Sequence, residues 1–220
     1  MSTPQRRYLV LGTDTDVGKT FVCAALCAAL LKTGSRVTVC KPVETGGQSD
    51  LDAIAHLCKR SERLRVRKGL RYALAGAPTA AAKAENRPAP SALDVAAIVR
   101  SSEEQADAVI VETCGGALTP LSHADVVADL VARLPEYRPV IVAGLRLGVL
   151  SHTFGAVEYL RSRGAREPLV VLNDRYASSP FWYVESTRGD LRLRGLDAVA
   201  FVGYRQSIED VDFSQLLRTA

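Results

Sequence analysis

The chain has 220 residues, of which 47% are hydrophobic and 24% are charged, and its formal net charge is +4 at pH 7. This composition argues against disorder and allows a substantial core, and we expect residues 1–220 to form one domain. The charge is modest and no segment reaches the ~20 apolar residues of a membrane-spanning helix, so we expect neither nucleic acid nor a membrane as a partner.

Residues 1–7 are polar and lack the pattern of a signal peptide. The five cysteines form no Cys-x-x-Cys pair, which favours buried, reduced thiols over a metal site or disulfides. Both observations predict a cytoplasmic protein.

Residues 12–20, Gly-Thr-Asp-Thr-Asp-Val-Gly-Lys-Thr, lie between an expected strand at 8–11 and an expected helix at 21–31. This order is typical of a P-loop, because the free N–H groups and the dipole of the helix attract phosphate. Lys19 would place its charge on the β- and γ-phosphates, Thr20 would ligate Mg²⁺, and Gly18 would let the backbone approach the phosphates. The loop is one residue longer than the usual pattern, with Thr13 in place of the first glycine. We expect nucleotide contacts from Thr13, Asp14, Asp16, Val17, Gly18, Lys19 and Thr20.

The middle of the chain continues this alternation. Residues 36–43 predict a second buried strand, followed by a loop at 44–49 and a helix at 51–58. The basic stretch 59–68 predicts an exposed strand or loop, and its lack of interleaved aromatic residues favours a solvated face over a nucleic-acid patch. Residues 73–90 are rich in Ala and Pro, and we expect a loop at 77–80.

The rest of the chain completes an α/β pattern. Ser91 is a typical helix cap, and the further expected elements are helices at 91–100, 125–134 and 151–163 and strands at 107–112, 139–143, 169–172 and 196–202. Residues 175–195 give only a weak helix pattern. Short apolar strands alternating with helices predict an α/β fold with a P-loop NTPase-type, mostly parallel sheet and helices on both faces. Ligands of such sheets bind at the carboxyl ends of the strands.

Polar residues at those ends indicate phosphoryl chemistry. Glu112 closes an apolar strand, the usual place for an acid that helps to hold Mg²⁺ in P-loop enzymes. Asp50 and Asp52, at the start of the helix after the second strand, are both candidates for another carboxylate. Lys41 ends an apolar strand, where a charge is costly unless it pairs with an anion. Together with Lys19, it predicts phosphoryl transfer to an acidic acceptor.

With these residues the chain resembles the dethiobiotin synthase family. The resemblance rests on the P-loop variant at 12–20, Lys-Pro-Val-Glu-Thr-Gly at 41–46, Asp-Ala at 52–53, Val-Glu-Thr-Cys-Gly-Gly at 111–116, Thr-Pro-Leu at 119–121 and Leu-Gly-Val-Leu-Ser-His at 147–152. It implies an ATP- and Mg²⁺-dependent ring closure. CO₂ and one amine of 7,8-diaminopelargonate give a carbamate, ATP phosphorylates the carbamate, and the second amine closes the ureido ring of dethiobiotin.

The resemblance also implies roles for individual residues. Thr15, Lys41 and Thr45 would hold the carbamate, while Lys19 and Lys41 neutralise the phosphoryl group in transfer. Mg²⁺ would be held by Thr20, Asp52 and Glu112, because the family pattern aligns the acid before alanine with Asp52 rather than Asp50. Family members are homodimers with the site at the interface, so the loop at 147–152 would meet the substrate's carboxylate tail from the partner subunit. The implied substrate contacts are Thr15, Lys41, Thr45, Gly115, Gly116, Leu147, Gly148 and Ser151.

Two segments depart from the family pattern. Asn173 matches the asparagine that reads the base, but the Gly-x-(Ile/Val)-Pro element that closes the other side is replaced by Val-Gly-Tyr-Arg at 202–205. We therefore expect Asn173, Gly203 and Tyr204 at the base, with weak discrimination between nucleotides. The family's Pro-His in the substrate loop is replaced by Ala-Ala-Lys at about 81–83.

Two alternative functions remain open. A related ATP-dependent amide ligase would act on a different diamine or acid, and the altered substrate loop leaves room for it. A partitioning or switch ATPase would bind a protein or DNA, but such proteins carry an additional lysine early in the P-loop. None of residues 13–17 is lysine, which counts against this alternative.

Overall fold

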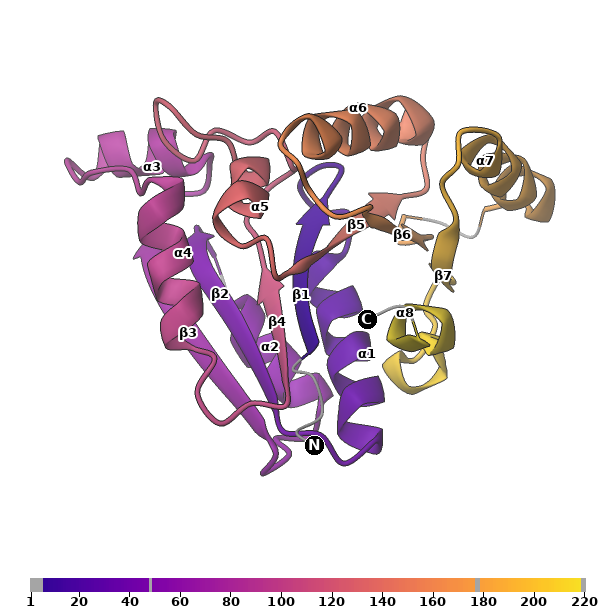
Figure 1. Cartoon of the computed structure of the whole chain (residues 1–220), viewed down its shortest axis with the longest axis horizontal. Helices are drawn as coiled ribbons and strands as arrows, with labels where there is room; N and C mark the ends of the chain where they lie inside the picture. Colours follow the sequence, from indigo (N-terminus) through magenta and orange to yellow (C-terminus); the bar gives the residue numbers. More distant parts are fainter. Residues whose placement is uncertain (1–5, 48, 177–178, 219–220) are drawn as a thin grey trace.

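The computed structural model describes residues 6–47, 49–176 and 179–218. These residues form a seven-stranded sheet in the order β3-β2-β4-β1-β5-β6-β7, in which every neighbouring pair is parallel (Figure 1). The strands are β1 (Arg6–Gly12), β2 (Val37–Thr45), β3 (Leu64–Tyr72), β4 (Ala108–Glu112), β5 (Arg138–Gly144), β6 (Leu169–Asn173) and β7 (Ala198–Val202). The predicted α/β fold is thus confirmed.

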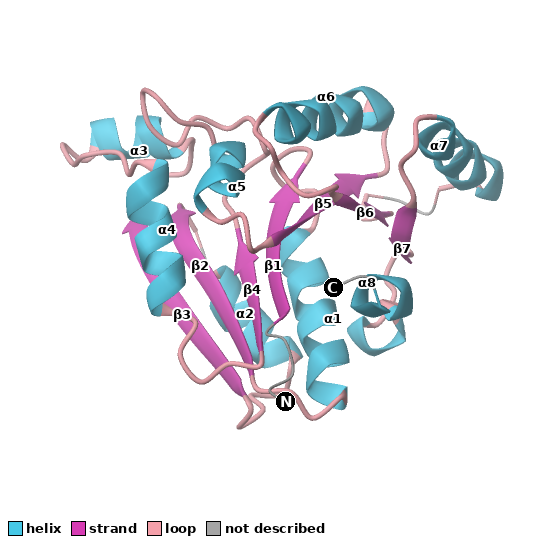
Figure 2. Ribbon diagram, viewed as in Figure 1, coloured by secondary structure: helices cyan, strands magenta, loops and turns pink. Residues whose placement is uncertain are grey.

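Helices cover both faces of this sheet (Figure 2). They are α1 (Lys19–Lys32), α2 (Asp50–Leu57), α3 (Pro78–Ala84), α4 (Ala92–Ser101), α5 (Leu130–Arg133), α6 (Val149–Ser162), α7 (Phe181–Leu193) and α8 (Ser214–Arg218), with 3₁₀ turns η1 (Val127–Asp129) and η2 (Ile208–Asp210). The apolar core has two parts: α1, α2 and α8 contribute to one, and α3 to α7 contribute to the other. Within the described residues, none of the helices has the length and apolar character needed to cross a membrane.

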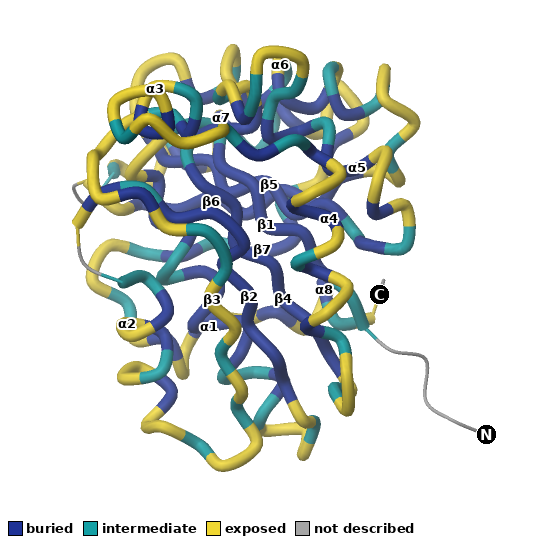
Figure 3. Tube along the Cα trace, turned by 90° about the vertical axis from the view of Figure 1, so that its left-hand side faces the viewer, coloured by how far each residue is buried: buried dark blue, intermediate teal, exposed yellow. Residues whose placement is uncertain are grey.

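The strand sequences explain the two-sided core. Successive side chains of a strand point to opposite faces of the sheet. In β1, Tyr8 and Val10 belong to one part of the core, whereas Leu9 and Leu11 belong to the other. Because both faces are covered, the strands are largely apolar, except for the edge strand β3. Figure 3 shows the inner strands as a buried interior between more exposed helices and loops.

One predicted helix is largely replaced by turns. The expected helix at 125–134 is reduced to η1 and the four-residue α5. The Asp125 carboxylate accepts hydrogen bonds from Ala92 N and Ser122 Oγ, both at 3.0 Å, and the Asp125 carbonyl accepts from Leu121 N at 2.9 Å. These bonds hold the segment before η1 in a turn, so the prediction of a continuous helix there was wrong.

Two further segments differ from expectation, and one agrees. The expected loop at 77–80 is instead the start of α3, where Pro78 occupies a first helical position that needs no N–H donor. The weak pattern at 175–195 contains α7, which buries only a narrow stripe of Val184, Thr187 and Leu191. The basic stretch leads into β3, an edge strand that is largely exposed, as predicted.

The strand order places three functional segments at one edge of the sheet. β4 lies between β1 and β2, with Val10 opposite Glu112 and Cys40 opposite Val111. Parallel strands in this register end together. Glu112 is therefore situated between the loop that follows β1 and the Lys41 side chain of β2.

Candidate functional site

The loop after β1 opens directly into α1, a helix of 14 residues that begins at Lys19. Gly18 adopts a φ of 90°, and a Cβ there would clash with Asn173 Nδ2, so glycine is required at this position. Lys19 is buried, and its Nζ donates to the Asp14 carbonyl at 3.1 Å. Burial lowers the pKa of Lys19, and the nearby Lys41 charge lowers it further. Lys19 is thus a desolvated cation beside the first N–H groups of a helix, as phosphate binding requires.

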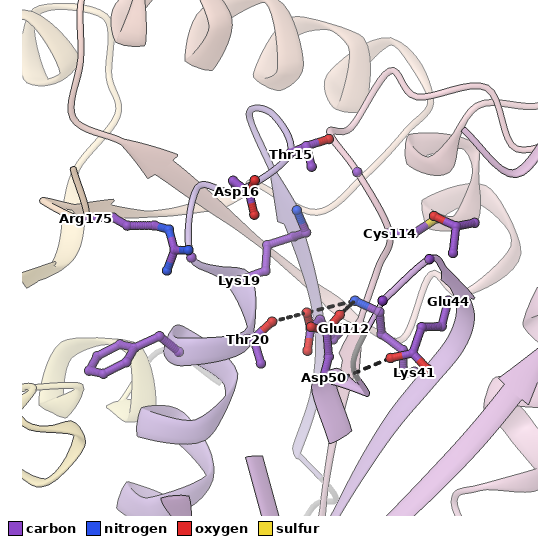
Figure 4. Close-up of a pocket in the computed structure, with 16 residues that line it drawn as sticks. Thr15, Asp16, Lys19, Thr20, Lys41, Glu44, Asp50, Glu112, Cys114 and Arg175 are labelled. Atoms are coloured by element: carbon purple, nitrogen blue, oxygen red, sulfur yellow. Dashed lines mark hydrogen bonds and ion pairs between the residues drawn. The ribbon is translucent and has the colours of Figure 1, made fainter. Parts of the chain in front are cut away.

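Glu112 joins the start of α1 to the middle of β2, where Lys41 is the fifth of nine residues and not, as expected, the end of the strand. Its Oε1 accepts from Thr20 Oγ1 and from Lys41 Nζ, both at 2.8 Å. Lys41 Nζ also lies 2.6 Å from Asp50 Oδ2, so the ammonium group is held between two carboxylates (Figure 4). Lys41 is 4% exposed and Glu112 is 1% exposed. The four side chains form one hydrogen-bonded group, which we call the acid–lysine cluster: Thr20, Lys41, Asp50 and Glu112.

The charges of the acid–lysine cluster depend on one another. Burial by itself would lower the pKa of Lys41, but the Glu112 and Asp50 carboxylates outweigh it and raise that pKa. Burial raises the pKa of Glu112, and Lys41 opposes this effect. Lys41 is therefore an ammonium ion at neutral pH, and it offsets the cost of burying Glu112.

The acid–lysine cluster fits a magnesium ion. Glu112 Oε2 is buried and has no hydrogen-bond partner, which leaves an acceptor without a cation or donor. Hydroxyl and carboxylate oxygens are ligands that Mg²⁺ prefers. Within the described ranges, no group of three or more His, Cys, Asp or Glu side chains could hold a metal ion. A bound Mg²⁺ would thus need phosphate and water oxygens as well, as is usual for this ion.

The structure does not bear out the preference for Asp52 over Asp50 as a ligand of Mg²⁺. Ser49 caps α2 by accepting from Asp52 N, so that Asp50 is the first helical residue and faces Lys41. Two residues correspond to about 200° of rotation on a helix. Asp52 consequently points away from the cluster, with 65% of its side chain exposed, and pairs with Lys68 Nζ at 3.1 Å.

A cavity of about 390 Å³ lies between the loop after β1, the end of β2 and the end of β4 (Figure 4). We call it the P-loop cavity. Its lining includes nine of the predicted site residues: Thr15, Asp16, Gly18, Lys19, Thr20, Lys41, Thr45, Glu112 and Gly115. It also includes residues to which no role was assigned from the sequence: Glu44, Gly46 and Cys114, which lie in the motifs of the family resemblance, and Phe21, Gly47 and Arg175, which do not. Asp50, the rejected alternative, completes the lining.

The predicted P-loop residues Thr13, Asp14 and Val17, and Gly116 from the loop after β4, do not line the P-loop cavity. Thr13 N donates to the Val142 carbonyl at 2.9 Å, and Val17 is buried in the core. Asp14 holds Lys19 through its carbonyl and pairs through its carboxylate with Arg146, a residue that sequence reasoning missed. Gly116 packs on the backbone of Asp14, where a Cβ would come within 3.1 Å of Asp14 Cα. These four residues set the shape of the loop.

A second hollow of about 210 Å³ contains all three predicted base contacts, Asn173, Gly203 and Tyr204. We call it the Tyr204 hollow. Phe21 and Arg175 line both it and the P-loop cavity, so the two are neighbours. Asn173 is buried, and its Nδ2 donates to the Val17 carbonyl at 2.8 Å, which ties β6 to the P-loop.

Two polar side chains that line the Tyr204 hollow, Asp174 and Gln206, already have hydrogen-bond partners within the protein. Both Asp174 oxygens accept from Ser179, at 2.7 Å each. Gln206 accepts from Gly203 N at 2.7 Å and donates to the Asp210 carbonyl at 2.8 Å. The hollow also offers the aromatic rings of Phe21 and Tyr204 and the guanidinium groups of Arg175 and Arg205.

The predicted substrate loop lies apart from both cavities. Leu147 is 92% exposed, Gly148 has a φ of 90°, and Ser151 lies in the first turn of α6. None of the three lines the P-loop cavity. Tyr183 Oη donates to the Arg146 carbonyl at 2.9 Å, which places the start of α7 beside this loop.

Comparison with known proteins shows similarity along most of the chain. A family model described as an AAA domain matches residues 6–206. The chain is 31% identical to the ATP-dependent dethiobiotin synthetase BioD of Methanocaldococcus jannaschii, over 95% of this chain and 99% of that protein. It is 36% identical to the ATP-dependent dethiobiotin synthetase BioD 1 of Escherichia coli K12, over 77% of this chain and 78% of that protein.

Solved structures show a similar fold at low identity. The 54 kDa signal recognition particle protein of Aeropyrum pernix K1, in complex with GDP, matches with a TM-score of 0.61 and 13% identity, over 99% of this chain and 46% of that one. FtsY of Mycoplasma mycoides matches with a TM-score of 0.58 and 15% identity, over 98% of this chain and 67% of that one. These matches confirm the predicted P-loop NTPase-type fold.

Proposed function

Because the chain belongs to the family of ATP-dependent dethiobiotin synthetases, we propose that it closes the ureido ring of dethiobiotin from 7,8-diaminopelargonate, CO₂ and ATP. It is then an ATP-dependent carbon–nitrogen ligase of biotin biosynthesis. The observation that carries this proposal is the meeting of Lys19, Lys41, Thr20 and Glu112 around one cavity at the start of α1.

The P-loop cavity suits a reaction that brings two anions together. A carbamate and a triphosphate repel each other, and Lys19 and Lys41 supply two ammonium groups from different elements of the fold. Positioning and charge stabilisation account for most of the catalysis of phosphoryl transfer. In our proposal, Lys19 binds the phosphates, while Lys41 holds the carbamate together with Thr15 and Thr45.

We assign Mg²⁺ to Thr20, Asp50 and Glu112. Asp50 replaces Asp52 in this assignment because Asp50 lines the P-loop cavity and Asp52 does not. When bound, the ion would supply positive charge to the phosphate oxygens. The protein's contribution is a set of oxygen ligands next to the helix terminus, of which Glu112 is buried.

Phosphate release from ATP tests the proposed reaction. We expect release by the purified protein to require both 7,8-diaminopelargonate and bicarbonate, with dethiobiotin formed in equal amount. Steady hydrolysis of ATP without the diamine would contradict the proposal and favour a switch ATPase. Phosphate release that depends on another amine or acid would favour a related amide ligase.

We further propose that residues 1–220 act as one domain in the cytoplasm. All five cysteines are free and buried, which suits a reducing compartment. The proposed reaction also consumes ATP, which the cytoplasm supplies.

An exposed apolar patch supports the expected homodimer. Leu147 is 92% exposed, and the first turn of α7 carries Phe181 and Trp182, which are 80% and 70% exposed. The Tyr183–Arg146 hydrogen bond holds this turn beside the Leu147 loop. Exposed apolar side chains grouped in this way mark interaction surfaces. In our proposal, a second copy covers this patch and brings the Leu147 loop to the partner's substrate.

Leu147→Asp is expected to dissociate the dimer. An apolar anchor at the centre of an interface typically contributes about 2 kcal/mol or more, or roughly 30-fold in affinity. Sedimentation should show a shift to monomer, and the KM for the diamine should rise about tenfold or more. Leu193→Asp is the matched control, because Leu193 is 86% exposed at the far end of α7. A dimeric Leu147→Asp protein with an unchanged KM would contradict the assignment.

The Tyr204 hollow is expected to bind the base without strong discrimination. A site discriminates when the wrong base leaves buried polar groups unpaired, but here Asp174 and Gln206 are already paired within the protein. We expect kcat/KM for ATP, CTP and GTP to agree within about tenfold, equivalent to 1.4 kcal/mol.

Tyr204→Ala provides a second measurement on the same hollow. Loss of a stacking surface costs roughly 1–3 kcal/mol per base and affects every base. We therefore expect KM to rise by a similar factor for all three nucleotides. A thousandfold preference for ATP in the unaltered protein would show instead that another element reads adenine.

A further inference from the structure

In the acid–lysine cluster, the Lys41 ammonium group pairs with the two carboxylates that would bind the proposed metal ion. Lys41 Nζ lies 2.6 Å from Asp50 Oδ2 and 2.8 Å from Glu112 Oε1. Both carboxylates are assigned to Mg²⁺ in the proposed function, on which this inference rests. We propose that Lys41 is an internal substitute for the divalent cation, and that it must leave Asp50 and Glu112 before these carboxylates can hold the metal.

The hydrogen bonds of Glu112 support this exchange. Its Oε1 already accepts from Thr20 Oγ1 and Lys41 Nζ, whereas Oε2 is buried without a partner. An oxygen that accepts two hydrogen bonds has no remaining lone pair for a metal. The Thr20 hydroxyl also points its hydrogen at the carboxylate in this arrangement. A cation could bind Glu112 Oε1 only after one of these hydrogen bonds is given up, whereas Oε2 is free to accept it.

The charges favour exchange over coexistence. Asp50 and Glu112 carry two negative charges, and Lys41 balances one of them. A divalent ion on the same oxygens would lie within a few ångströms of the ammonium group, in a buried site where like charges repel strongly. Removal of Lys41 from the pair relieves this repulsion, and the divalent ion then balances both carboxylates.

The position of Lys41 links this exchange to binding of the carbamate. Its side chain comes from β2 and lines the P-loop cavity, as do Thr15 and Thr45, the proposed carbamate contacts. A lysine released from the acids can turn its ammonium group into this cavity without any change of the strand. Lys41 then becomes available for the carbamate only once the metal site is filled, which orders the two events.

Metal affinity without nucleotide tests the exchange directly. Mn²⁺ is the probe, its free concentration is followed by electron paramagnetic resonance, and no turnover is involved. We expect Lys41→Met to bind Mn²⁺ at least about tenfold more tightly than the unaltered protein, because the competing ammonium group is gone. Lys19→Met is the matched control: it removes another ammonium group that lines the same cavity but donates to the Asp14 carbonyl rather than to a carboxylate. It should change the affinity less than threefold.

Two results of this titration would overturn the proposal. One is Mn²⁺ binding by Lys41→Met that is no tighter than that of the unaltered protein. The other is an equal gain in Lys19→Met, which would reflect the overall charge of the cavity rather than a specific competitor.

A second measurement uses the unaltered protein, in case Lys41→Met does not fold. With lysine labelled at ¹³Cε, we expect the Lys41 signal to move on saturation with Mg²⁺ and a non-hydrolysable ATP analogue. The nucleotide alone, without the metal, should leave that signal in place. A Lys41 signal that Mg²⁺ does not move would show that the lysine stays on the acids, and would overturn the proposal. Neither measurement needs diaminopelargonate, so a failure of the proposed ring closure would leave both interpretable.

Discussion

Lys41→Ala is expected to lower kcat for ring closure by about 100-fold or more while leaving nucleotide affinity nearly intact. Loss of one positioned charge on a developing anion costs on the order of 10² to 10³ in rate. Lys41 belongs to β2 rather than to the P-loop, and its ammonium group contacts Asp50, Glu112 and the Thr113 carbonyl. The measurements are kcat for dethiobiotin formation and the Kd of a non-hydrolysable ATP analogue.

Lys68→Ala is the matched control for this variant. Lys68 lies opposite Lys41 in the neighbouring strand β3, but its side chain is 54% exposed and pairs with Asp52. It should retain nearly full activity, because an exposed ion pair contributes little. If Lys41→Ala lost nucleotide binding as severely as Lys19→Ala, Lys41 would act on ATP and the role proposed for it would be wrong.

Asp50→Asn is expected to raise the Mg²⁺ concentration needed for half-maximal turnover by about tenfold or more, and excess Mg²⁺ should restore part of the activity. Substitution of a group that supports a metal typically costs 10- to 100-fold in metal affinity. The amide keeps the shape of Asp50 but lacks the negative charge that a hard cation prefers. Turnover measured over a series of Mg²⁺ concentrations tests this expectation.

Asp52→Asn separates the two candidate acids. Asp52 lies two residues further along α2 and pairs with Lys68 away from the P-loop cavity. The Mg²⁺ concentration that the Asp52→Asn protein needs for half-maximal turnover should therefore stay within about twofold of the value for the unaltered protein. The reverse pattern, with a large effect for Asp52→Asn and none for Asp50→Asn, would restore the assignment that the family resemblance implies.

The sequence by itself determined the architecture and the phosphate end of the site. The strands are short apolar runs that alternate with helical patterns, which predicts a parallel sheet covered on both faces. The P-loop is local, because Gly18, Lys19 and Thr20 are neighbours at a helix start and the required groups are supplied by the backbone. Glu112 could be predicted because it is a charged residue at the end of an apolar strand, and Lys41 because a charge in an apolar strand is costly unless it pairs with an anion.

Only the tertiary structure decided how these groups combine. Asp50 and Asp52 are equivalent by composition, and the cap at Ser49 sets the rotation of α2 that turns one of them toward Lys41. The pairing of Lys41 with Glu112 depends on strand order, which places β4 between β1 and β2 and brings together residues 71 positions apart. Asp174 and Gln206 pair with residues only three to five positions away, but such side-chain hydrogen bonds leave no periodic signal in a sequence. Local pattern thus specifies which elements form and where charges end up along them, whereas packing between elements decides which charges meet.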